Sequence, residues 1–186
     1  ALAAASAAYA LGIPLKQIKK SLESVEGVAR RFERVRVNSD FHIIVDYAHT
    51  PDSLENVLRT CREFAKGKVS VVVGCGGDRD KTKRPKMAKI AEQFADFVYI
   101  TSDNPRTEDP QSIINDMLKG LTSSRYSVHL DRREAIFEAV RRAEKDEIIL
   151  IAGKGHETYQ IIGKETIYFD DRVVAKEAVE ERNKHD

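Results

Sequence analysis

Residues 147–157 read EIILIAGKGHE. This stretch is the clearest indication of the fold class, because an unbroken apolar run ends abruptly at glycines and charged side chains. Apolar runs of this length without alternation are typical of strands buried on both faces of a parallel sheet. Four other runs share this character: residues 43–46, 69–74, 97–101 and 127–130. Helical patterns separate the runs, and repeated strand-helix-strand order predicts an α/β fold with a mainly parallel sheet and helices on both faces.

The helices between these runs have recognisable start residues. Thr50 before Pro51, Asp109 before Pro110, and Asp131 are of the residue types that cap helix N-termini. The first of these helices presents one apolar face: Leu54, Val57, Leu58, Cys61 and Phe64. Two hairpins are expected beside the sheet: residues 33–37 with 41–45, and residues 159–162 with 165–169.

Composition limits the classes of function. The chain has 186 residues and 41% hydrophobic content, enough for one full domain and part of another. Its formal net charge of +1 gives no long-range field that would attract nucleic acid or an anionic membrane. Two cysteines, Cys61 and Cys75, are too few for a disulfide scaffold and predict reduced thiols in the cytoplasm. Neither a membrane span nor a signal peptide is indicated by any apolar run.

The first residues differ in character from the rest. Residues 1–11 and residues 15–24 are expected to form two helices. The pattern then changes to β runs, which places a domain boundary near residues 25–30. Because the chain begins at Ala1 without a methionine, we expect it to be a piece of a longer polypeptide.

Loops dense in charge or glycine follow four of the predicted strands. In a parallel sheet the carboxyl ends of all strands lie on one edge, where open α/β folds bind ligands. The loops on that edge are residues 46–51 (DYAHTP), 74–80 (GCGGDRD), 101–106 (TSDNPR) and 153–157 (GKGHE). Loops on the opposite edge are ordinary polar connectors, so the sequence predicts a binding site at the carboxyl edge.

Common phosphate and metal motifs do not fit these loops. A dinucleotide fingerprint starting at Gly74 needs glycine where Arg79 stands, and a P-loop over the same residues needs glycine in place of Asp80. A zinc-protease motif starting at His156 needs histidine in place of Gln160. No metal ligands are assigned from the sequence.

The run Asp103-Asn104-Pro105-Arg106 combines four kinds of recognition chemistry within four residues. Asp103 can accept an ammonium group, whereas Asn104 and Arg106 can bind a carboxylate. Pro105 fixes the backbone of the turn. The alternative interpretation is an Asx-Pro turn that carries surface charges.

Other residues on the same edge favour recognition of a zwitterionic amino acid over a plain turn. Arg79 and Glu157 are expected to converge there, and Gly153 allows the backbone to approach a ligand closely. His49 and His156 are candidate acid-base groups, although a hydrogen-bonded loop histidine is an equally good interpretation of each.

At these residues the sequence resembles the C-terminal part of the Mur ligases, in particular the members that add meso-diaminopimelate to a peptidoglycan precursor. The resemblance covers essentially the whole chain and rests on five motifs in order: residues 31–33 (RFE), 46–51 (DYAHTP), 74–80 (GCGGDRD), 103–106 (DNPR) and 152–157 (AGKGHE). It implies that residues 1–27 are the last helices of a central ATP-binding domain. Residues 28–186 would form the C-terminal, Rossmann-like domain that binds the amino acid.

The resemblance also implies roles for individual residues. Arg31, Asp46 and His49 would line the nucleotide side of the closed enzyme. ATP and Mg²⁺ would be bound mainly by the central domain, whose P-loop is not in this sequence, so the chain alone is expected to be inactive. No residue is assigned as a general base. Diaminopimelate would be bound by seven residues, of which Pro105 shapes the turn: Arg79, Asp103, Asn104, Pro105, Arg106, Gly153 and Glu157.

The implied reaction forms a peptide bond while ATP is hydrolysed to ADP and phosphate. ATP would phosphorylate the D-glutamyl carboxylate of UDP-N-acetylmuramoyl-L-alanyl-D-glutamate, and the incoming amine would displace phosphate. Arg106 favours diaminopimelate, because lysine lacks the second carboxylate that a guanidinium would bind. The alternatives are a lysine-adding ligase of the family, another ligase of this fold such as a folylpolyglutamate or cyanophycin synthetase, and a non-catalytic module that senses amino acids.

Overall fold

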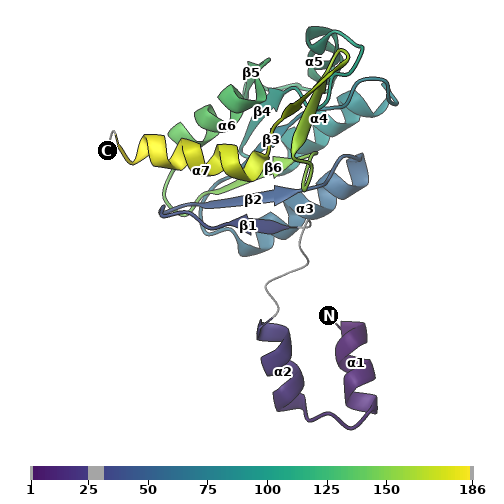
Figure 1. The fold of residues 1–186 in the computed structure, drawn as a ribbon, viewed down its shortest axis with the longest axis vertical. Helices are drawn as coiled ribbons and strands as arrows, with labels where there is room; N and C mark the ends of the chain where they lie inside the picture. Colours follow the sequence, from purple (N-terminus) through teal and green to yellow (C-terminus); the bar gives the residue numbers. More distant parts are fainter. Residues whose placement is uncertain (1, 25–31, 185–186) are drawn as a thin grey trace.

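The computed structural model describes residues 2–24 and 32–184 (Figure 1). The first two helices are α1 (Leu2–Ala10) and α2 (Leu15–Ser24). The later helices are α3 (Pro51–Phe64), α4 (Lys83–Phe94), α5 (Pro110–Leu118), α6 (Arg132–Arg141) and α7 (Asp171–Arg182). The strands are β1 (Glu33–Val35), β2 (His42–Asp46), β3 (Val69–Val73), β4 (Phe97–Thr101), β5 (Tyr126–His129), β6 (Ile148–Ala152), β7 (Tyr159–Ile162) and β8 (Glu165–Tyr168).

Six strands of the described chain form one sheet in the order β1-β2-β6-β3-β4-β5. All neighbours are parallel except β1 and β2, which form the expected antiparallel hairpin with Arg34 opposite Ile44. The prediction of a mainly parallel sheet is therefore confirmed. Because β6 lies between β2 and β3, loops that are far apart in the sequence meet at the carboxyl edge.

Helices cover both faces of this sheet (Figure 1), as the apolar runs predicted. α3, α4 and α5 pack on one face, and α6 and α7 pack on the other. Side chains alternate between the faces along each strand. In β6, Leu150 and Ala152 face the first group of helices, whereas Ile149 and Ile151 face the second. Burial on both faces explains why the strands lack polar alternation.

The predicted N-cap residues are all in place. Thr50 caps α3 in a reciprocal capping box with Ser53, and the side chains of Asp109 and Asp131 cap α5 and α6. The sequence placed Phe64 on the apolar face of α3 with the core residues. That prediction is wrong, because Phe64 is 69% exposed. Phe64 is the last residue of α3 and lies beyond the turns that pack on the sheet, so helical periodicity alone does not place it in the core.

The second predicted hairpin is also confirmed, and it stands beside the sheet as a separate pair of strands. β7 and β8 are antiparallel, with Gln160 opposite Ile167. Two backbone hydrogen bonds join this hairpin to the loop after β4. The Arg106 N–H donates to the Ile161 carbonyl at 3.0 Å, and the Gly163 N–H donates to the Arg106 carbonyl at 2.6 Å. The hairpin therefore holds one side of the predicted binding loop.

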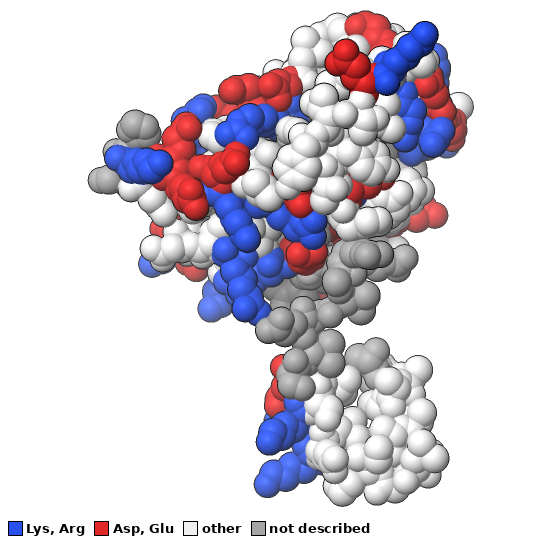
Figure 2. All heavy atoms as spheres, in the orientation of Figure 1, with Lys and Arg blue, Asp and Glu red and all other residues white. Residues whose placement is uncertain are grey.

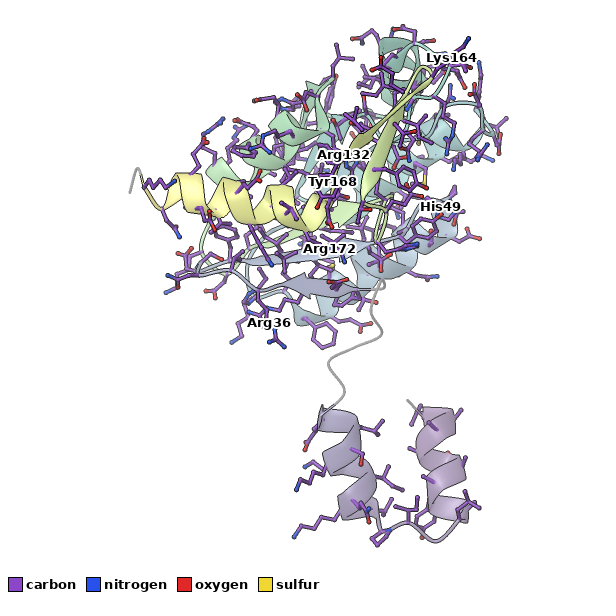
Figure 3. The ribbon with its side chains drawn as sticks, viewed as in Figure 1. Arg36, His49, Arg132, Lys164, Tyr168 and Arg172 are labelled. Atoms are coloured by element: carbon purple, nitrogen blue, oxygen red, sulfur yellow. The ribbon has the colours of Figure 1, made fainter. Side chains whose placement is uncertain are left out.

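A buried ion pair joins the starts of α6 and α7. Arg132 (Figure 3) and Asp171 form two hydrogen bonds of 2.8 Å, and both side chains are 0% exposed. The Arg132 guanidinium also donates to the carbonyls of Ser102 at 3.3 Å and Ala152 at 3.1 Å. Those carbonyls lie at the ends of β4 and β6, so Arg132 ties the second helix layer to the carboxyl edge of the sheet.

The surface charge agrees with the composition. Figure 2 shows basic and acidic side chains intermixed over the face in view, in keeping with a formal net charge of +1.

Both cysteines, Cys61 and Cys75, are buried free thiols. Within residues 2–24 and 32–184, every helix is too short or too polar to cross a bilayer. The predicted boundary near residues 25–30 lies outside the described residues, so the division into residues 1–27 and 28–186 stays a prediction.

Replacing Asp171 with asparagine should lower the free energy of unfolding by about 3 kcal/mol, because Arg132 would stay buried without a charged partner. Urea denaturation of the purified chain measures this loss. The control is Glu177→Gln, which breaks the pair of Glu177 with Arg133 on the same two helices. Those side chains are 44% and 45% exposed, so the control should cost less than about 1 kcal/mol. Equal losses in the two variants would contradict the role given to Arg132.

Candidate functional site

A cavity of about 570 Å³ opens at the carboxyl edge of the sheet. Its walls come from the loops after β2, β3, β4 and β6, which are the four loops that the sequence predicted. Six of the seven predicted amino-acid-binding residues line it: Arg79, Asp103, Asn104, Arg106, Gly153 and Glu157. Pro105 is buried behind the loop and lines a neighbouring cavity instead.

Asp103 is held against the end of β6. Its Oδ1 accepts the Asn104 N–H at 2.7 Å, and its carbonyl accepts the Gln160 side chain at 2.7 Å. A Cβ atom placed on Gly153 would lie 2.7 Å from Oδ2 of Asp103, and Gly153 has a φ of +116°. Glycine is therefore required at residue 153 both for its backbone conformation and for the close approach of this carboxylate.

Asn104 joins the loop after β4 to two other segments. Its Nδ2 donates to Glu157 Oε2 at 2.8 Å, and its Oδ1 accepts the Ile161 N–H at 2.9 Å. Its carbonyl accepts the Gly77 N–H at 2.9 Å. The side chain is nearly fully buried, so its main visible role is to fix Glu157 and the β7–β8 hairpin relative to the loop.

Arg106 presents a guanidinium without a carboxylate partner among the described residues. Its Nη1 donates to the carbonyls of Gly77 at 2.9 Å and Asn104 at 3.4 Å. Its φ of +52° is a backbone conformation that non-glycine residues rarely adopt. The Nε and Nη2 donors have no partner in the described chain, and together they form a two-donor edge that matches a carboxylate.

Arg79 is the second guanidinium on the cavity wall, and among the described residues its Nη1 donates to the carbonyl of Asp78, at 3.0 Å. The cavity wall therefore carries three cations, Arg79, Lys83 and Arg106, and three carboxylates, Asp80, Asp103 and Glu157. Such a wall can bind a ligand that carries both ammonium and carboxylate groups.

The sequence interpretation missed Lys154, a buried cation behind this wall. Its side chain is 0% exposed, and its Nζ lies 3.5 Å from Glu157 Oε2 and donates to the carbonyl of Tyr159. Burial lowers the pKa of Lys154, and the nearby Asp103 carboxylate opposes that shift. The only local signal is a lysine placed between two glycines at a strand end, which does not show that its charge is buried.

A second cavity, of about 430 Å³, shares a wall with the first. Asp46 and His49 line it, and His49 lines both cavities. Asp46 Oδ2 accepts the Phe32 N–H at 2.6 Å, and His49 Nδ1 lies 2.8 Å from the Tyr47 carbonyl. Arg31, the third residue predicted for the nucleotide side, lies outside the described residues.

The polar groups of this second cavity are hydroxyls, an amide, an imidazole and a carboxylate, and no lysine or arginine of the described chain lines it. Such groups suit the sugar or base of a nucleotide better than its phosphates. The described residues also contain no group of three or more His, Cys, Asp or Glu side chains arranged to hold a metal ion.

The candidate acid-base residues lie around Tyr47. The ring of Tyr47 is 4.6 Å from that of His49 and 5.3 Å from that of His156, measured between centroids. Burial and the nearby Glu157 raise the pKa of Tyr47, so its hydroxyl stays protonated at neutral pH. The geometry singles out neither histidine as a base, and both interpretations of each remain open.

Comparisons with known proteins agree with the resemblance seen in the motifs. Residues 30–155 match the family model described as "Mur ligase, glutamate ligase domain". A 2,6-diaminopimelate ligase of UDP-N-acetylmuramoyl-L-alanyl-D-glutamate from Halalkalibacterium halodurans is 62% identical over 97% of this chain and 37% of its own length. The enzyme of the same name from Bacillus velezensis is 56% identical over 98% of this chain and 37% of its own length.

Solved structures show the same relation. The structure of a ligase of this name superimposes with a TM-score of 0.83 at 41% identity, over 98% of this chain and 38% of that one. A folylpolyglutamate synthase/dihydrofolate synthase from Yersinia pestis reaches a TM-score of 0.56 at 21% identity, over 72% of this chain and 30% of that one, which shows a shared fold alone. The chain spans a little over a third of the length of the curated relatives it matches.

Replacing Gly153 with alanine should lower the free energy of unfolding by about 3 kcal/mol, because the new Cβ strains the backbone and collides with Asp103. The control is Gly163→Ala, where φ is +61° and no atom lies within 4 Å of the added Cβ. The control should cost only about 1 kcal/mol, from backbone strain alone. Thermal and urea unfolding of both variants measure the difference, and equal costs would show that Asp103 moves aside freely.

Proposed function

The chain belongs to the Mur ligase family, and from that premise we propose that it is the C-terminal, amino-acid-binding domain of a ligase that adds meso-diaminopimelate to UDP-N-acetylmuramoyl-L-alanyl-D-glutamate. Such a ligase forms a peptide bond in peptidoglycan synthesis and hydrolyses ATP to ADP and phosphate. The observation that carries the proposal is the cavity that brings Asp103, Arg106, Arg79 and Glu157 together.

The charges of diaminopimelate match those of this cavity. The molecule has an ammonium and a carboxylate at each end, and the cavity wall offers cations (Arg79, Lys83 and Arg106) and carboxylates (Asp80, Asp103 and Glu157) that can pair with both kinds of group. Arg106 and Arg79 would bind carboxylates, whereas Asp103 and Glu157 would accept ammonium groups. Asn104 would act mainly by holding Glu157 in place, because its side chain is already hydrogen bonded at both ends.

These residues would contribute to the reaction by placing the nucleophile. An amine held in line with the acyl carbon reacts as if it were very concentrated, and such orientation can supply roughly 7–11 kcal/mol of the barrier. Charged contacts at both ends of the amino acid fix its position and direction. No general base is assigned, since neither His49 nor His156 has a geometry that singles it out.

ATP would contact this chain at the second cavity. Asp46 and His49 line it, and its hydroxyl and amide groups suit the sugar or base of ATP. The phosphates and Mg²⁺ would be bound mainly elsewhere in the full-length protein, because this cavity has no cationic wall in the described chain. Residues 1–27 would be the last helices of that ATP-binding domain, and the UDP-linked dipeptide would be bound by the upstream domains.

Two alternatives remain to be separated from this proposal by experiment. A lysine-adding ligase of the family would release ADP with lysine and not with diaminopimelate. An amino-acid-sensing module would bind its ligand without any turnover. ADP release by the full-length protein, with the UDP-linked dipeptide and each amino acid in turn, distinguishes all three.

Replacing Arg106 with alanine in the full-length ligase should raise the KM for diaminopimelate about 100-fold, because a charge-assisted pair is worth roughly 3 kcal/mol. The KM for ATP should not change. The control is Arg125→Ala, because the Arg125 guanidinium also donates to backbone carbonyls but lies at the opposite edge of the sheet. An unchanged KM for diaminopimelate in the Arg106 variant would refute the proposed binding mode.

A further inference from the structure

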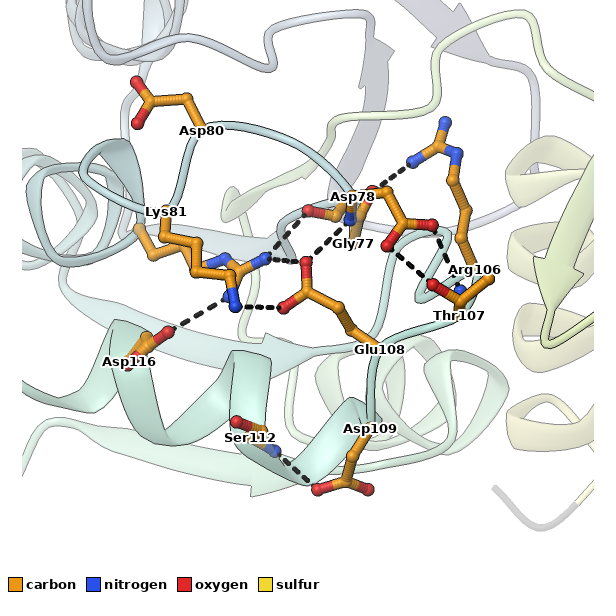
Figure 4. Close-up of polar contacts among 12 residues, drawn as sticks. Gly77, Asp78, Asp80, Lys81, Arg106, Thr107, Glu108, Asp109, Ser112 and Asp116 are labelled. Atoms are coloured by element: carbon orange, nitrogen blue, oxygen red, sulfur yellow. Dashed lines mark hydrogen bonds and ion pairs between the residues drawn. The ribbon is translucent and has the colours of Figure 1, made fainter.

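Two loop carbonyls orient Arg106, and the Gly77 carbonyl is the nearer, because the Asn104 carbonyl lies 3.4 Å from the same nitrogen. The Arg106 Nη1 donates to the Gly77 carbonyl at 2.9 Å (Figure 4), and this bond leaves the Nε and Nη2 edge free to face the cavity. A guanidinium that binds a carboxylate with two parallel hydrogen bonds must be aligned in its own plane. Any displacement of Gly77 would therefore rotate the edge that the ligand needs.

The glycine loop has little freedom at Gly77. The Gly77 N–H donates to the Asn104 carbonyl at 2.9 Å, and a Cβ on this glycine would lie 1.9 Å from the Pro105 carbonyl. The next residue, Asp78, has a φ of +54°. Non-glycine residues adopt this conformation when surrounding contacts hold them there. The contacts made by Asp78 therefore hold the loop in this conformation.

Two carboxylates, one from each loop, cross between the glycine loop and the loop after β4. The Asp78 carboxylate accepts the Thr107 hydroxyl at 2.8 Å and the Thr107 N–H at 3.2 Å. In the reverse direction, Glu108 Oε1 accepts the Asp78 N–H at 2.6 Å. Figure 4 shows both connections beside the bond from Arg106 to Gly77.

A buried arginine holds Glu108 in this arrangement. Arg84, whose side chain is 0% exposed, donates to Glu108 Oε1 at 2.8 Å and pairs with Asp116 at 3.0 Å. Lys81 adds a contact of 3.2 Å to Glu108 Oε2. The hydrogen bonds from Arg84 and from the Asp78 N–H lower the pKa of Glu108 to about 2, so it stays ionised at neutral pH.

We infer that Glu108, anchored by Arg84, is a positioning residue that sets the affinity of the amino-acid site for a ligand with a second carboxylate. It does so by fixing the Asp78 backbone, and with it the Gly77 carbonyl that aligns Arg106. Glu108 does not line the cavity, so it acts on the ligand indirectly, through the loop that aligns Arg106. This inference rests on the proposed function, because the ligand concerned is diaminopimelate.

The test uses Glu108→Gln in the full-length ligase, with steady-state kinetics in diaminopimelate and in ATP. Glutamine keeps the length of the side chain and one acceptor oxygen, but it removes the charge that pairs with Arg84 and Lys81 and so weakens the hydrogen bond from the Asp78 N–H. The KM for diaminopimelate should rise about tenfold, while kcat and the KM for ATP stay within about threefold. An unchanged KM for diaminopimelate would overturn the inference.

The control is Glu92→Gln. Although burial opposes the shift, hydrogen bonds from Ser123 and Thr122 lower the pKa of Glu92 to about 2, so this carboxylate, like Glu108, is an ionised acceptor of several hydrogen bonds. It braces the loop before β5, away from the cavity, and its loss should leave the KM for diaminopimelate unchanged. An equal rise in both variants would show a general loss of stability in place of positioning.

A double-mutant cycle separates positioning from a merely structural effect. If Glu108 acts through Arg106, Glu108→Gln should cause no further rise in KM once Arg106 is alanine. The same fold-rise in both backgrounds would overturn the inference. If Glu108→Gln does not fold, Thr107→Val removes the hydroxyl that binds Asp78 without removing a charge, and a KM for diaminopimelate unchanged in that variant overturns it equally.

The failure of the proposed function would look different. A parent enzyme that releases no ADP with diaminopimelate refutes the proposed function, and this inference falls with it. A parent enzyme that uses diaminopimelate, paired with a Glu108 variant of unchanged KM, refutes only the inference.

Discussion

The parallel alignment of β2, β6, β3 and β4 is the constraint on which the candidate site depends. It brings the loops after these strands to one edge of the sheet, although they are spread between residues 46 and 157. The two helix layers bury both faces of the strands, so the register of each strand against its neighbours is fixed by the core. The loops can then carry charge and strained backbone, because the sheet and not the loops supplies most of the stability.

Buried cations link these loops to each other. Arg84, Arg132 and Lys154 have side chains that are 0% exposed, and each has at least one carboxylate partner. A buried charge is costly unless its partner and hydrogen bonds are in place, so each of these groups penalises any arrangement in which its loop has moved. The attraction within each buried pair is largely offset by the cost of removing its charges from water, so the pairs add little net stability. They nevertheless restrict the site to one geometry.

The sequence predicted the parts of the structure that local patterns determine. Apolar runs gave the strands, and Thr50, Asp109 and Asp131 gave the helix starts, because a strand's burial and a helix cap each depend on a few adjacent residues. Arg84 and Arg132 were not predicted as buried, because their partners Glu108 and Asp171 lie 24 and 39 residues away.

The candidate site shows the same division between local and distant signals. The charged loops met at one edge because a parallel sheet requires it, and six of the seven predicted residues line one cavity. The hydrogen-bond and ion-pair partners of each side chain within the cavity could not be predicted from the sequence. Asn104 is hydrogen bonded at both ends of its amide, and Glu157 is 3.5 Å from Lys154, a contact that depends on how the whole loop folds.

In the free protein the anionic side of the cavity is thus partly neutralised, whereas Arg79 and Arg106 have no carboxylate partner among the described residues. An incoming ammonium gains less at Glu157 than a carboxylate gains at a guanidinium, because Lys154 already shares that acceptor. Discrimination between amino acids should therefore arise mainly at the guanidinium side, where a ligand that lacks a second carboxylate leaves a cation unpaired.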